Sequence, residues 1–597
     1  MLPEERTHSS ARIRIVQVAL AMVFLLLAAR LFDLQVLRAG GAEGPAVSQE
    51  EAAQRLARGR IVDQRGVLLA TDIFLWEVGA NPLTFHDDDQ RLRAAVCLQE
   101  AVGIPQGDIL DLLQEDSKYV VIGRGLSTDI ARRINGDLAD DLQDQTYSAS
   151  DSASPGDGDA RISGAGLCTW PLVNQVWSTP YRRRLYPQGE HFSHFLGFIV
   201  RDGDSFYGLE EHYQEFLEGR RVPELARRKA VLPVQEISSF LPSDVGYDLV
   251  LTVDWRIQQV VETSLAEAIA SSGAESGTII VMDPKTGAIL ASASYPAYDP
   301  NHYQSYVQGA EIFADPAISR IYEPGSVFKV VTLAIALDSG AITVDSVFDD
   351  PGVLEVGGRI FRNADGQAHG RVTATEILAR SLNVGIAHVG EQTGTETFYR
   401  YLPRFGFGAK TGVDLAHEAD GLAKFPSSPN WSLSDFIANT FGQAISVTPL
   451  QMVSAVAAIA NGGVLMQPHV VEQVVVTGEV FQVPPVVVGR AISADAAQVL
   501  TRMMVTAVQS GAPDALIDEC EVAGKTGTAQ VPEPGGYHDE WTIASFVGYA
   551  PAENPAFACI IKLDKPQSSI WGAEVAAPIF REIAPDILRI LQVPPEA

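Results

Sequence analysis

Cysteine is scarce in this chain, and so is positive charge. The 597 residues include four cysteines, Cys97, Cys168, Cys520 and Cys559. None lies in a C-x-x-C pair, and no cysteine–histidine cluster has zinc-ligand spacing, so we expect no metal site, no disulfide framework and no cofactor. Asp and Glu outnumber Lys and Arg by 74 to 44, a net charge of −30. Because phosphates repel such a surface, the composition argues against a nucleic-acid partner.

One apolar run near the N-terminus has the length of a membrane span. Residues 13–37 suffice if Arg30 reaches outward to the interface. Arginines are concentrated before the run, which favours a cytoplasmic tail at 1–12 and an exported remainder. A cleaved signal peptide is the alternative, but the charged and bulky residues after the core fit a cleavage site poorly. We therefore expect an uncleaved, single-pass membrane anchor.

Residues 38–245 have the character of one region with an insertion. Residues 58–71 predict a strand–turn–strand with its turn near 63–66, and motifs become dense again at 181–221. Between them, residues 136–166 are rich in Asp, Ser and Gly. Such a composition buries too little apolar surface to order itself, so we expect a disordered acidic insertion there.

The remainder reads as one large α+β domain behind a short connection. A strand near 246–254 and a helix at 255–271 form the connection, residues 246–276. A hairpin of strands at 277–283 and 288–294 opens the domain at 277–590. Later strands are expected near 520–525, 541–549 and 556–563. That order predicts an antiparallel sheet built from both ends of the domain, with helices between them.

Three short stretches carry the candidate chemistry. Ser326 precedes an apolar run that predicts a buried helix, and Lys329 follows at i+3 on the same helical face. Ser381-Leu382-Asn383 follows a helix-like segment at 374–380. Lys525-Thr526-Gly527-Thr528 follows the strand-like 520–523. The order S-x-x-K, S-x-N, K-T-G-T is that of penicillin-binding proteins and class A β-lactamases.

Similar tripeptides occur elsewhere in the chain. K-T-G also occurs at 285–287, in a hairpin turn before the serine, and at 410–412, in a glycine-rich loop. S-x-N recurs at 428–430 with a proline in its centre. Reading 524–526 as the end of a phosphate-binding loop needs glycine at 519, where the chain has Glu519. Order and local structure select the first triple.

The chemistry explains why these residue types occur together. A serine hydroxyl needs a base, and a lysine must first lose its proton to serve as one. Burial and a second cation, Lys525, would lower the pKa of Lys329 so that its amine accepts the proton of Ser326. Ser381 would relay that proton to the leaving amine, and Asn383 would hold the substrate amide.

Substrate binding falls to the third stretch. The backbone N–H groups of Ser326 and Thr528 would bind the oxyanion. Lys525 and the hydroxyls of Thr526 and Thr528, on either side of Gly527, suit a terminal carboxylate. If this strand lies at a sheet edge, it can pair with an extended peptide.

With these motifs the chain resembles class B penicillin-binding proteins, the division type in particular. R-G-R-I-V-D-Q-R-G (58–66) and R-L-Y-P-Q-G-E (184–190) resemble the family's pedestal motifs, although Gln64 stands where arginine is usual. F-G-Q-A-I-S-V-T-P-L-Q (441–451) and S-F-V-G-Y-A-P (545–551) resemble its transpeptidase motifs. The resemblance implies a serine β-lactamase-like transpeptidase domain behind a mostly β pedestal and a membrane helix.

The resemblance also implies a function. The chain would be a peptidoglycan D,D-transpeptidase that cross-links stem peptides through a serine acyl-enzyme, is acylated by β-lactams, and works in the cell membrane with a glycosyltransferase and other division proteins. Two alternatives stay open. One is a D,D-carboxypeptidase or β-lactamase, in which water takes the acyl group. The other is a non-catalytic β-lactam sensor or division scaffold.

Overall fold

A computed structural model describes residues 58–135, 175–200, 203–219, 246–476, 479–533 and 536–595. The predicted tail at 1–12, the span at 13–37 and the acidic insertion at 136–166 lie outside these residues. Within the described part of the chain, no helix combines the length and the apolarity that crossing a membrane requires. The described residues form two compact units, one of 74–135 and 175–182 and the other of 58–73 and the residues from 183 onward.

The first unit packs three helices against strands. Its elements are residues 74–80 of β2 (Leu68–Ala80), α3 (Asp88–Val102), α4 (Gln106–Leu113), β3 (Val120–Leu126), α5 (Thr128–Asn135) and residues 176–182 of β4 (Val176–Leu185). Leu98, Ile109 and Leu113 are among its buried core residues. The expectation of a mostly β region is therefore wrong here, because the mixed sequence at 88–135 forms amphipathic helices. Cys97 on α3 is disulfide-bonded, which the sequence did not lead us to expect.

In the second unit, the predicted strand–turn–strand near residue 60 is confirmed. β1 (Ile61–Val62) pairs antiparallel with β2 and parallel with β7 (Asp248–Leu251). Asp63 forms the turn, because its Oδ1 accepts hydrogen bonds from the N–H groups of Arg65 (2.8 Å) and Val67 (2.7 Å). The sheet continues from β7 to β15 (Val471–Val476) and β16 (Glu479–Gln482).

A buried ionic cluster joins the two pedestal motifs. Nε of Arg58 donates to Oε2 of Glu210, and Nε of Arg184 donates to Oε1, both at 2.7 Å. Burial alone would raise the pKa of Glu210, but the two guanidinium groups hold that pKa below its ordinary value. Because each carboxylate oxygen has a charged donor, the cluster holds segments that lie more than a hundred residues apart in sequence.

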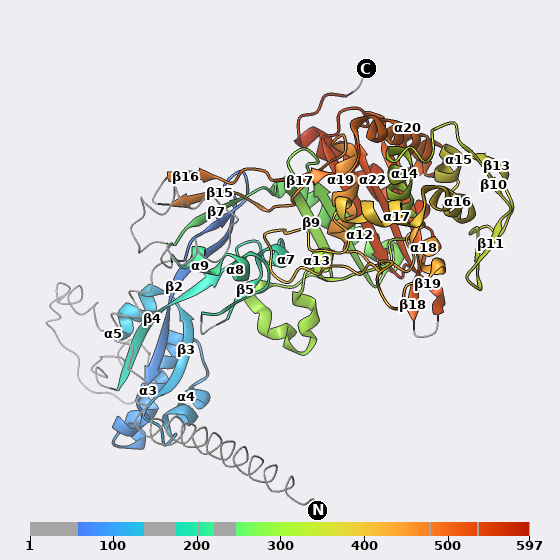
Figure 1. The fold of residues 1–597 in the computed structure, drawn as a ribbon. Helices are drawn as coiled ribbons and strands as arrows, with labels where there is room; N and C mark the ends of the chain where they lie inside the picture. Colours follow the sequence, from blue (N-terminus) through green and yellow to red (C-terminus); the bar gives the residue numbers. More distant parts are fainter. Residues whose placement is uncertain are drawn as a thin grey trace, which may run out of the picture. The chain divides into compact units, whose positions relative to one another are not determined.

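The predicted antiparallel sheet from both ends of the domain is confirmed, and the domain is α+β. Its strands run in the order β18, β19, β20, β8, β9. Figure 1 shows the green β9 and the red C-terminal strands in the same sheet. The bounds are β8 (Ser276–Met282), β9 (Ile289–Tyr295), β18 (Ala523–Glu533), β19 (Gly536–Ala550) and β20 (Phe557–Asp564). The first late strand thus begins and ends later than the predicted 520–525, since long-range pairing with β19 extends it.

Alternating side chains of this sheet enter two different cores. Ile279 and Val281 of β8 pack with α12 (Trp255–Ser272) and α22 (Ala577–Ile590). Ile280 and Met282 belong to the other core, with α14 (Lys329–Asp338) and α19 (Pro449–Ala460). This is the period of two that a strand buried on both faces requires. The central sheet is therefore a rigid support for whatever lies at its edge.

The remaining elements complete the described structure. They are η2 (Pro82–Thr84), α7 (Ser193–Leu196), β5 (Phe198–Ile199), β6 (Ser205–Phe206), α8 (Gly208–His212), α9 (Gln214–Leu217), η4 (Pro300–Phe313), α13 (Pro316–Ser319), η5 (Gly325–Phe328), β10 (Val347–Asp350), β11 (Val353–Val356), β12 (Arg359–Arg362), β13 (Gly370–Thr373), α15 (Ala374–Ala379), α16 (Asn383–Thr393), α17 (Thr395–Tyr401), η6 (Leu402–Phe405), α18 (Leu433–Asn439), β14 (Val464–Met466), β17 (Val487–Arg490), α20 (Ala494–Gly511), η7 (Pro513–Ala515) and α21 (Gly572–Val575).

Candidate active site

Ser326 lies on a tight turn rather than in the first turn of an α-helix. Residues 325–328 form the 3₁₀ turn η5, and α14 begins at Lys329. Gly325 has φ +59°, and its N–H donates to the carbonyl of Gly442 at 2.9 Å. A Cβ on Gly442 would lie 2.2 Å from the Gly325 carbonyl oxygen, so only glycine allows this approach. The glycine pair thereby fixes the backbone that presents Ser326.

Lys329 is completely buried and contacts the S-x-N stretch. Its Nζ donates to the carbonyl oxygen of Ser381 at 2.5 Å, to the Ser381 Oγ at 3.2 Å and to Oδ1 of Asn383 at 2.8 Å. Burial lowers the pKa of Lys329 well below its ordinary value, and the charge of Lys525 lowers it further, whereas Asp350 opposes the shift. This is the direction that a lysine base requires.

The S-x-N stretch follows a helix, as the sequence predicts, and a second helix, which was not predicted, begins at its asparagine. Ser381 follows α15, and Asn383 is the first residue of α16. Ser381 has φ +58°, an uncommon value for a residue other than glycine. Nδ2 of Asn383 donates to the carbonyl of Arg362 at 3.0 Å, which leaves Oδ1 facing Lys329.

The K-T-G-T stretch lies on β18, an edge strand of the five-stranded sheet. Lys525 is 4% exposed, and its Nζ donates to the Thr526 carbonyl at 2.9 Å and to the Thr526 Oγ1 at 3.3 Å. Burial lowers the pKa of Lys525 to about 7. A Cβ on Gly527 would meet the Ser545 Oγ at 2.5 Å and Val327 Cγ1 at 2.9 Å, so glycine lets the strand lie close to the serine turn.

One cavity of about 470 Å³ brings six of the eight predicted site residues together: Ser326, Ser381, Asn383, Lys525, Thr526 and Thr528. Lys329 is buried beside two of them, and Gly527 lies in the strand between two others. The Ser326 hydroxyl makes no hydrogen bond with any other described residue and is available for attack. The arrangement combines a nucleophile, a buried amine and an unpaired strand edge, which suits acyl transfer from a peptide.

The sequence missed several residues of this cavity. Trp571, Ala573 and Glu574 line it from the start of α21, and Asp365 and Arg380 line it from loops beside the S-x-N stretch. No short motif marked them, because they reach the cavity only through tertiary packing. Asp365 and Glu574 are its carboxylates, paired with His369 and the Ser569 hydroxyl. Among the described residues, neither carboxylate is hydrogen-bonded to Ser326.

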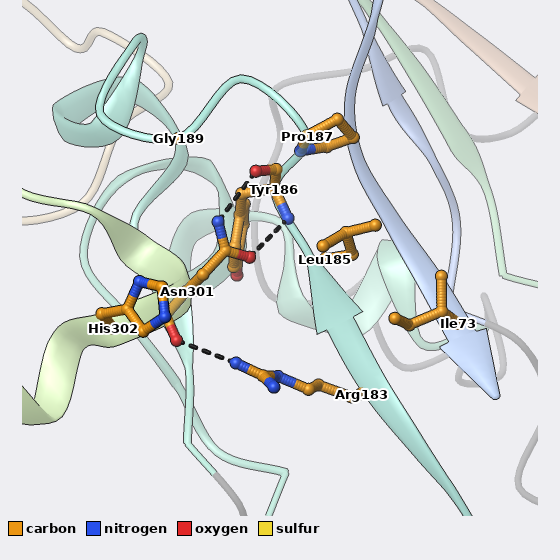
Figure 2. A pocket seen from close by; sticks show the side chains of 8 residues that line it. All are labelled: Ile73, Arg183, Leu185, Tyr186, Pro187, Gly189, Asn301 and His302. Carbon is orange, nitrogen blue, oxygen red and sulfur yellow. Dashed lines mark hydrogen bonds between the residues drawn. The ribbon is translucent and has the colours of Figure 1, made fainter. Parts of the chain in front are cut away.

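A second cavity, of about 320 Å³, contains none of the predicted site residues. It is lined by Ile73, Arg183, Leu185, Tyr186, Pro187, Gly189, Asn301 and His302. Figure 2 shows the Asn301 side chain facing the backbone of Tyr186. Its Oδ1 accepts from the Tyr186 N–H at 3.0 Å and its Nδ2 donates to the Tyr186 carbonyl at 2.8 Å, as a neighbouring strand would. The contact is structural, and the cavity holds no paired nucleophile and base.

Nothing in the described residues offers a metal site. No group of three His, Cys, Asp or Glu side chains there is placed to hold an ion.

Comparison with known proteins decides the family. Residues 277–584 match the family model described as the penicillin binding protein transpeptidase domain. These residues make up more than half of the chain. The chain belongs to this family. The match begins in β8 and ends in α22, so it contains every predicted site residue of this penicillin-binding protein.

Relatives of the penicillin-binding protein extend the match beyond that domain. It is 30% identical over 600 residues to penicillin-binding protein PbpB of Mycolicibacterium smegmatis, covering 96% of this chain and 90% of that protein. It is 28% identical over 590 residues to peptidoglycan D,D-transpeptidase FtsI of Escherichia coli K12, covering 97% of this chain and 91% of that protein. A solved structure is also similar: the crystal structure of penicillin-binding protein 3 from Mycobacterium tuberculosis, complexed with aztreonam. Its sequence is 28% identical to this chain and its TM-score is 0.65, and the match covers 91% of this chain and 98% of that one.

Proposed function

We propose that this penicillin-binding protein is a peptidoglycan D,D-transpeptidase. The observation that carries the proposal is the position of Lys329, whose buried amine meets the S-x-N stretch behind a cavity that opens on Ser326 and on the edge strand β18. The relative in Escherichia coli bears the name of this activity.

Acylation would begin at Ser326. The neutral amine of Lys329 takes the hydroxyl proton as Oγ attacks the carbonyl carbon of the penultimate D-alanine. The C–N bond of the tetrahedral intermediate then breaks, and the Ser381 hydroxyl passes a proton to the departing terminal D-alanine. An ester on Ser326 remains. The amine of a neighbouring stem peptide attacks that ester, an amide forms, and Ser326 regains its proton.

Substrate binding would follow the chemistry of the edge strand. On one side, β18 pairs with no strand of the described residues, so its backbone groups there can hold an extended peptide, as at other sheet edges. The N–H groups of Ser326 and Thr528 would stabilise the oxyanion. Lys525, Thr526 and Thr528 would bind the terminal carboxylate, and Asn383 would hold the amide. A β-lactam presents the same amide and carboxylate, so we expect it to acylate Ser326.

The cellular setting belongs to the same proposal. The apolar run at 13–37 would anchor the protein in the cell membrane, with the tail at 1–12 in the cytoplasm and the rest outside. Residues 38–245 would form the pedestal and 277–590 the transpeptidase domain. The protein would act in septal wall synthesis, together with a glycosyltransferase and other division proteins.

Labelling with a fluorescent penicillin tests the nucleophile. We expect the wild type to form a covalent adduct on the peptide that contains Ser326, and Ser326→Ala to form none. Ser428→Ala, in the proline-containing S-x-N at 428–430, is the matched control and should label normally. An adduct that persists in Ser326→Ala would refute the assignment, and a wild type that forms none would leave only the scaffold alternative, since a β-lactam sensor must itself react with the penicillin.

A second assay separates transpeptidase from carboxypeptidase. A pentapeptide donor is supplied with and without an acceptor amine, and the products are separated by mass. We expect the amine to replace water in the product when it is present. Hydrolysis that dominates at saturating acceptor would contradict a transpeptidase and favour the carboxypeptidase.

A further inference from the structure

The helix that carries Asn383 lacks a cap of its own. Helices α15, α18 and α19 each begin with a Thr or Ser that forms a capping box. The N-cap of α16 is Leu382, whose side chain accepts no hydrogen bond. A helix start that is buried without acceptors for its first N–H groups is unstable, so α16 needs acceptors from another part of the chain.

Two residues from the hairpin region before α15 supply those acceptors. Oδ1 of Asn363, just after β12, accepts from the N–H of Val384 at 3.0 Å. Oδ2 of Asp350, the last residue of β10, accepts from the N–H of Gly385 at 3.1 Å. Nδ2 of Asn363 also donates to Oδ1 of Asp350 at 2.7 Å, which locks the two side chains together. Asp350 is 0% and Asn363 4% exposed.

The sequence of the S-x-N stretch explains why the cap comes from elsewhere. Serine and asparagine are good capping residues, but the side chains of Ser381 and Asn383 face Lys329. Leu382 lies between them and is buried. Gly385 lets the start of α16 pack against α15, since a Cβ there would lie 2.7 Å from Cγ1 of Ile377, whereas Oδ2 of Asp350 would lie at an ordinary contact distance of 3.4 Å.

Asp350 also brings a buried negative charge to the site. Its oxygens accept from three N–H donors, those of Gly352 (2.9 Å), Asn363 and Gly385. Two charged groups act on Lys329. The cation of Lys525, from β18, lowers the pKa of Lys329 together with burial, and the anion of Asp350, from β10, raises it.

We propose that Asp350 and Asn363 are positioning residues for the S-x-N stretch: they cap α16 so that Ser381 and Asn383 meet Lys329, and Asp350 offsets the charge of Lys525 at that amine. The inference rests on the proposed acyl transfer at Ser326. Asn363 also lines the cavity, whereas Asp350 does not; the role assigned to both runs through the start of α16 and through Lys329.

Two variants separate the cap from the charge. Asn363→Ala removes the acceptor for Val384 and leaves the carboxylate, whereas Asp350→Asn keeps the shape and removes the charge. The rate of acylation of the full chain by a fluorescent penicillin is measured from acid to alkaline pH. Melting temperature is followed for both, and Ser493→Ala, which removes the self-supplied cap of α20, is the control for a general loss of helix stability.

We expect Asn363→Ala to slow acylation about tenfold at every pH, because the N–H of Val384 loses its buried acceptor and Asp350 loses the donor that holds it in place. We expect Asp350→Asn to slow it at the plateau and to move the acid limb to lower pH. The sign follows because Lys329 acts when neutral, and loss of an anion nearby lowers its pKa. Ser493→Ala should melt earlier and acylate normally.

The outcomes are distinct from failure of the proposed function. A wild type that forms no adduct refutes the function itself. A labelled wild type with both variants within twofold of it at all pH values overturns the proposal, and an unmoved acid limb in Asp350→Asn overturns the role of the charge. Asn363→Ala alters no buried charge, so it decides the capping role even if Asp350→Asn does not fold.

Discussion

The same tripeptide, Lys-Thr-Gly, lies in two different settings at 410–412 and 525–527. In the loop, the N–H and hydroxyl of Thr411 and the N–H of Gly412 all donate to the carboxylate of Glu418. On β18, no described carboxylate is hydrogen-bonded to Thr526 or Thr528, and both line the cavity. The loop tripeptide already has its carboxylate, whereas the threonine side chains of the edge strand line a cavity that a carboxylate from outside can enter. The difference supports a carboxylate-bearing substrate at β18.

The two lysines should separate the settings most strongly. Lys410 is exposed and Lys525 is buried. Truncating one partner of a buried charged pair costs about 2–5 kcal/mol, so Lys525→Ala should slow acylation by penicillin about 10²- to 10³-fold. Loss of the neighbouring cation also raises the pKa of Lys329 and adds to the effect at neutral pH. Lys410→Ala should acylate at the wild-type rate. Equal rates for the two variants would break the comparison.

A pH series on stability tests the burial of Lys525. Its folded pKa is about 7, below the ordinary 10.5, so between these values the unfolded chain binds more protons. Stability therefore rises with pH in that window, and the gain is lost as pH falls through 7. From pH 8 to pH 10 the wild type should gain about 2 kcal/mol relative to Lys525→Met, at 1.36 kcal/mol per unit.

Denaturant unfolding at several pH values measures that difference, because other groups titrate in both proteins and cancel. A flat difference from pH 8 to pH 10 would mean that Lys525 stays charged in the folded protein. Such a result would contradict the low pKa of Lys525 but not the position of β18 at the sheet edge.

Residue spacing predicted the site better than it predicted the supports of the site. Ser326, Lys329 and the two later stretches were recognisable because each motif is local and their order is informative. The sequence did not predict whether β18 lies at an edge of the sheet, because that position depends on pairing between strands far apart in sequence. The cap of α16 was invisible for the same reason. The only local sign of this cap is that the N-cap residue is a leucine, which cannot cap the helix itself.

The sequence predicted the fold less well before residue 246 than after it. The turn at Asp63 was predictable, because an aspartate that bonds the N–H groups after it is a local device. Helices α3 to α5 were not predicted, since their apolar faces become clear only against the core that they cover. The antiparallel sheet was predicted from the opening hairpin and the order of the later strands, but the end of β18 was not.

The threonines test whether the hydroxyl serves substrate in one setting and structure in the other. Thr526→Val, at the position that matches Thr411, should slow acylation about tenfold, because a hydrogen bond to a charged group contributes about 1.5 kcal/mol. Thr411→Val should acylate normally but unfold about 1 kcal/mol more easily, since the buried carboxylate of Glu418 loses a donor. Acylation rates and denaturant unfolding of both variants give the check. Slower acylation in Thr411→Val would contradict the division of roles.

The third copy, at 285–287, should show the smallest effect. Lys285 is exposed, and its Nζ donates to Oδ1 of Asn554 at 2.8 Å on the surface of a hairpin turn. Lys285→Ala should change the free energy of unfolding by less than about 0.5 kcal/mol and leave acylation unchanged. Gly287→Ala is the matched control in the same turn, because φ is +81° and a Cβ would lie 2.4 Å from the Gln467 carbonyl oxygen, so it should cost clearly more. If Lys285→Ala slowed acylation, lysine in this tripeptide would matter outside the edge strand, and the contrast between the settings would lose its basis.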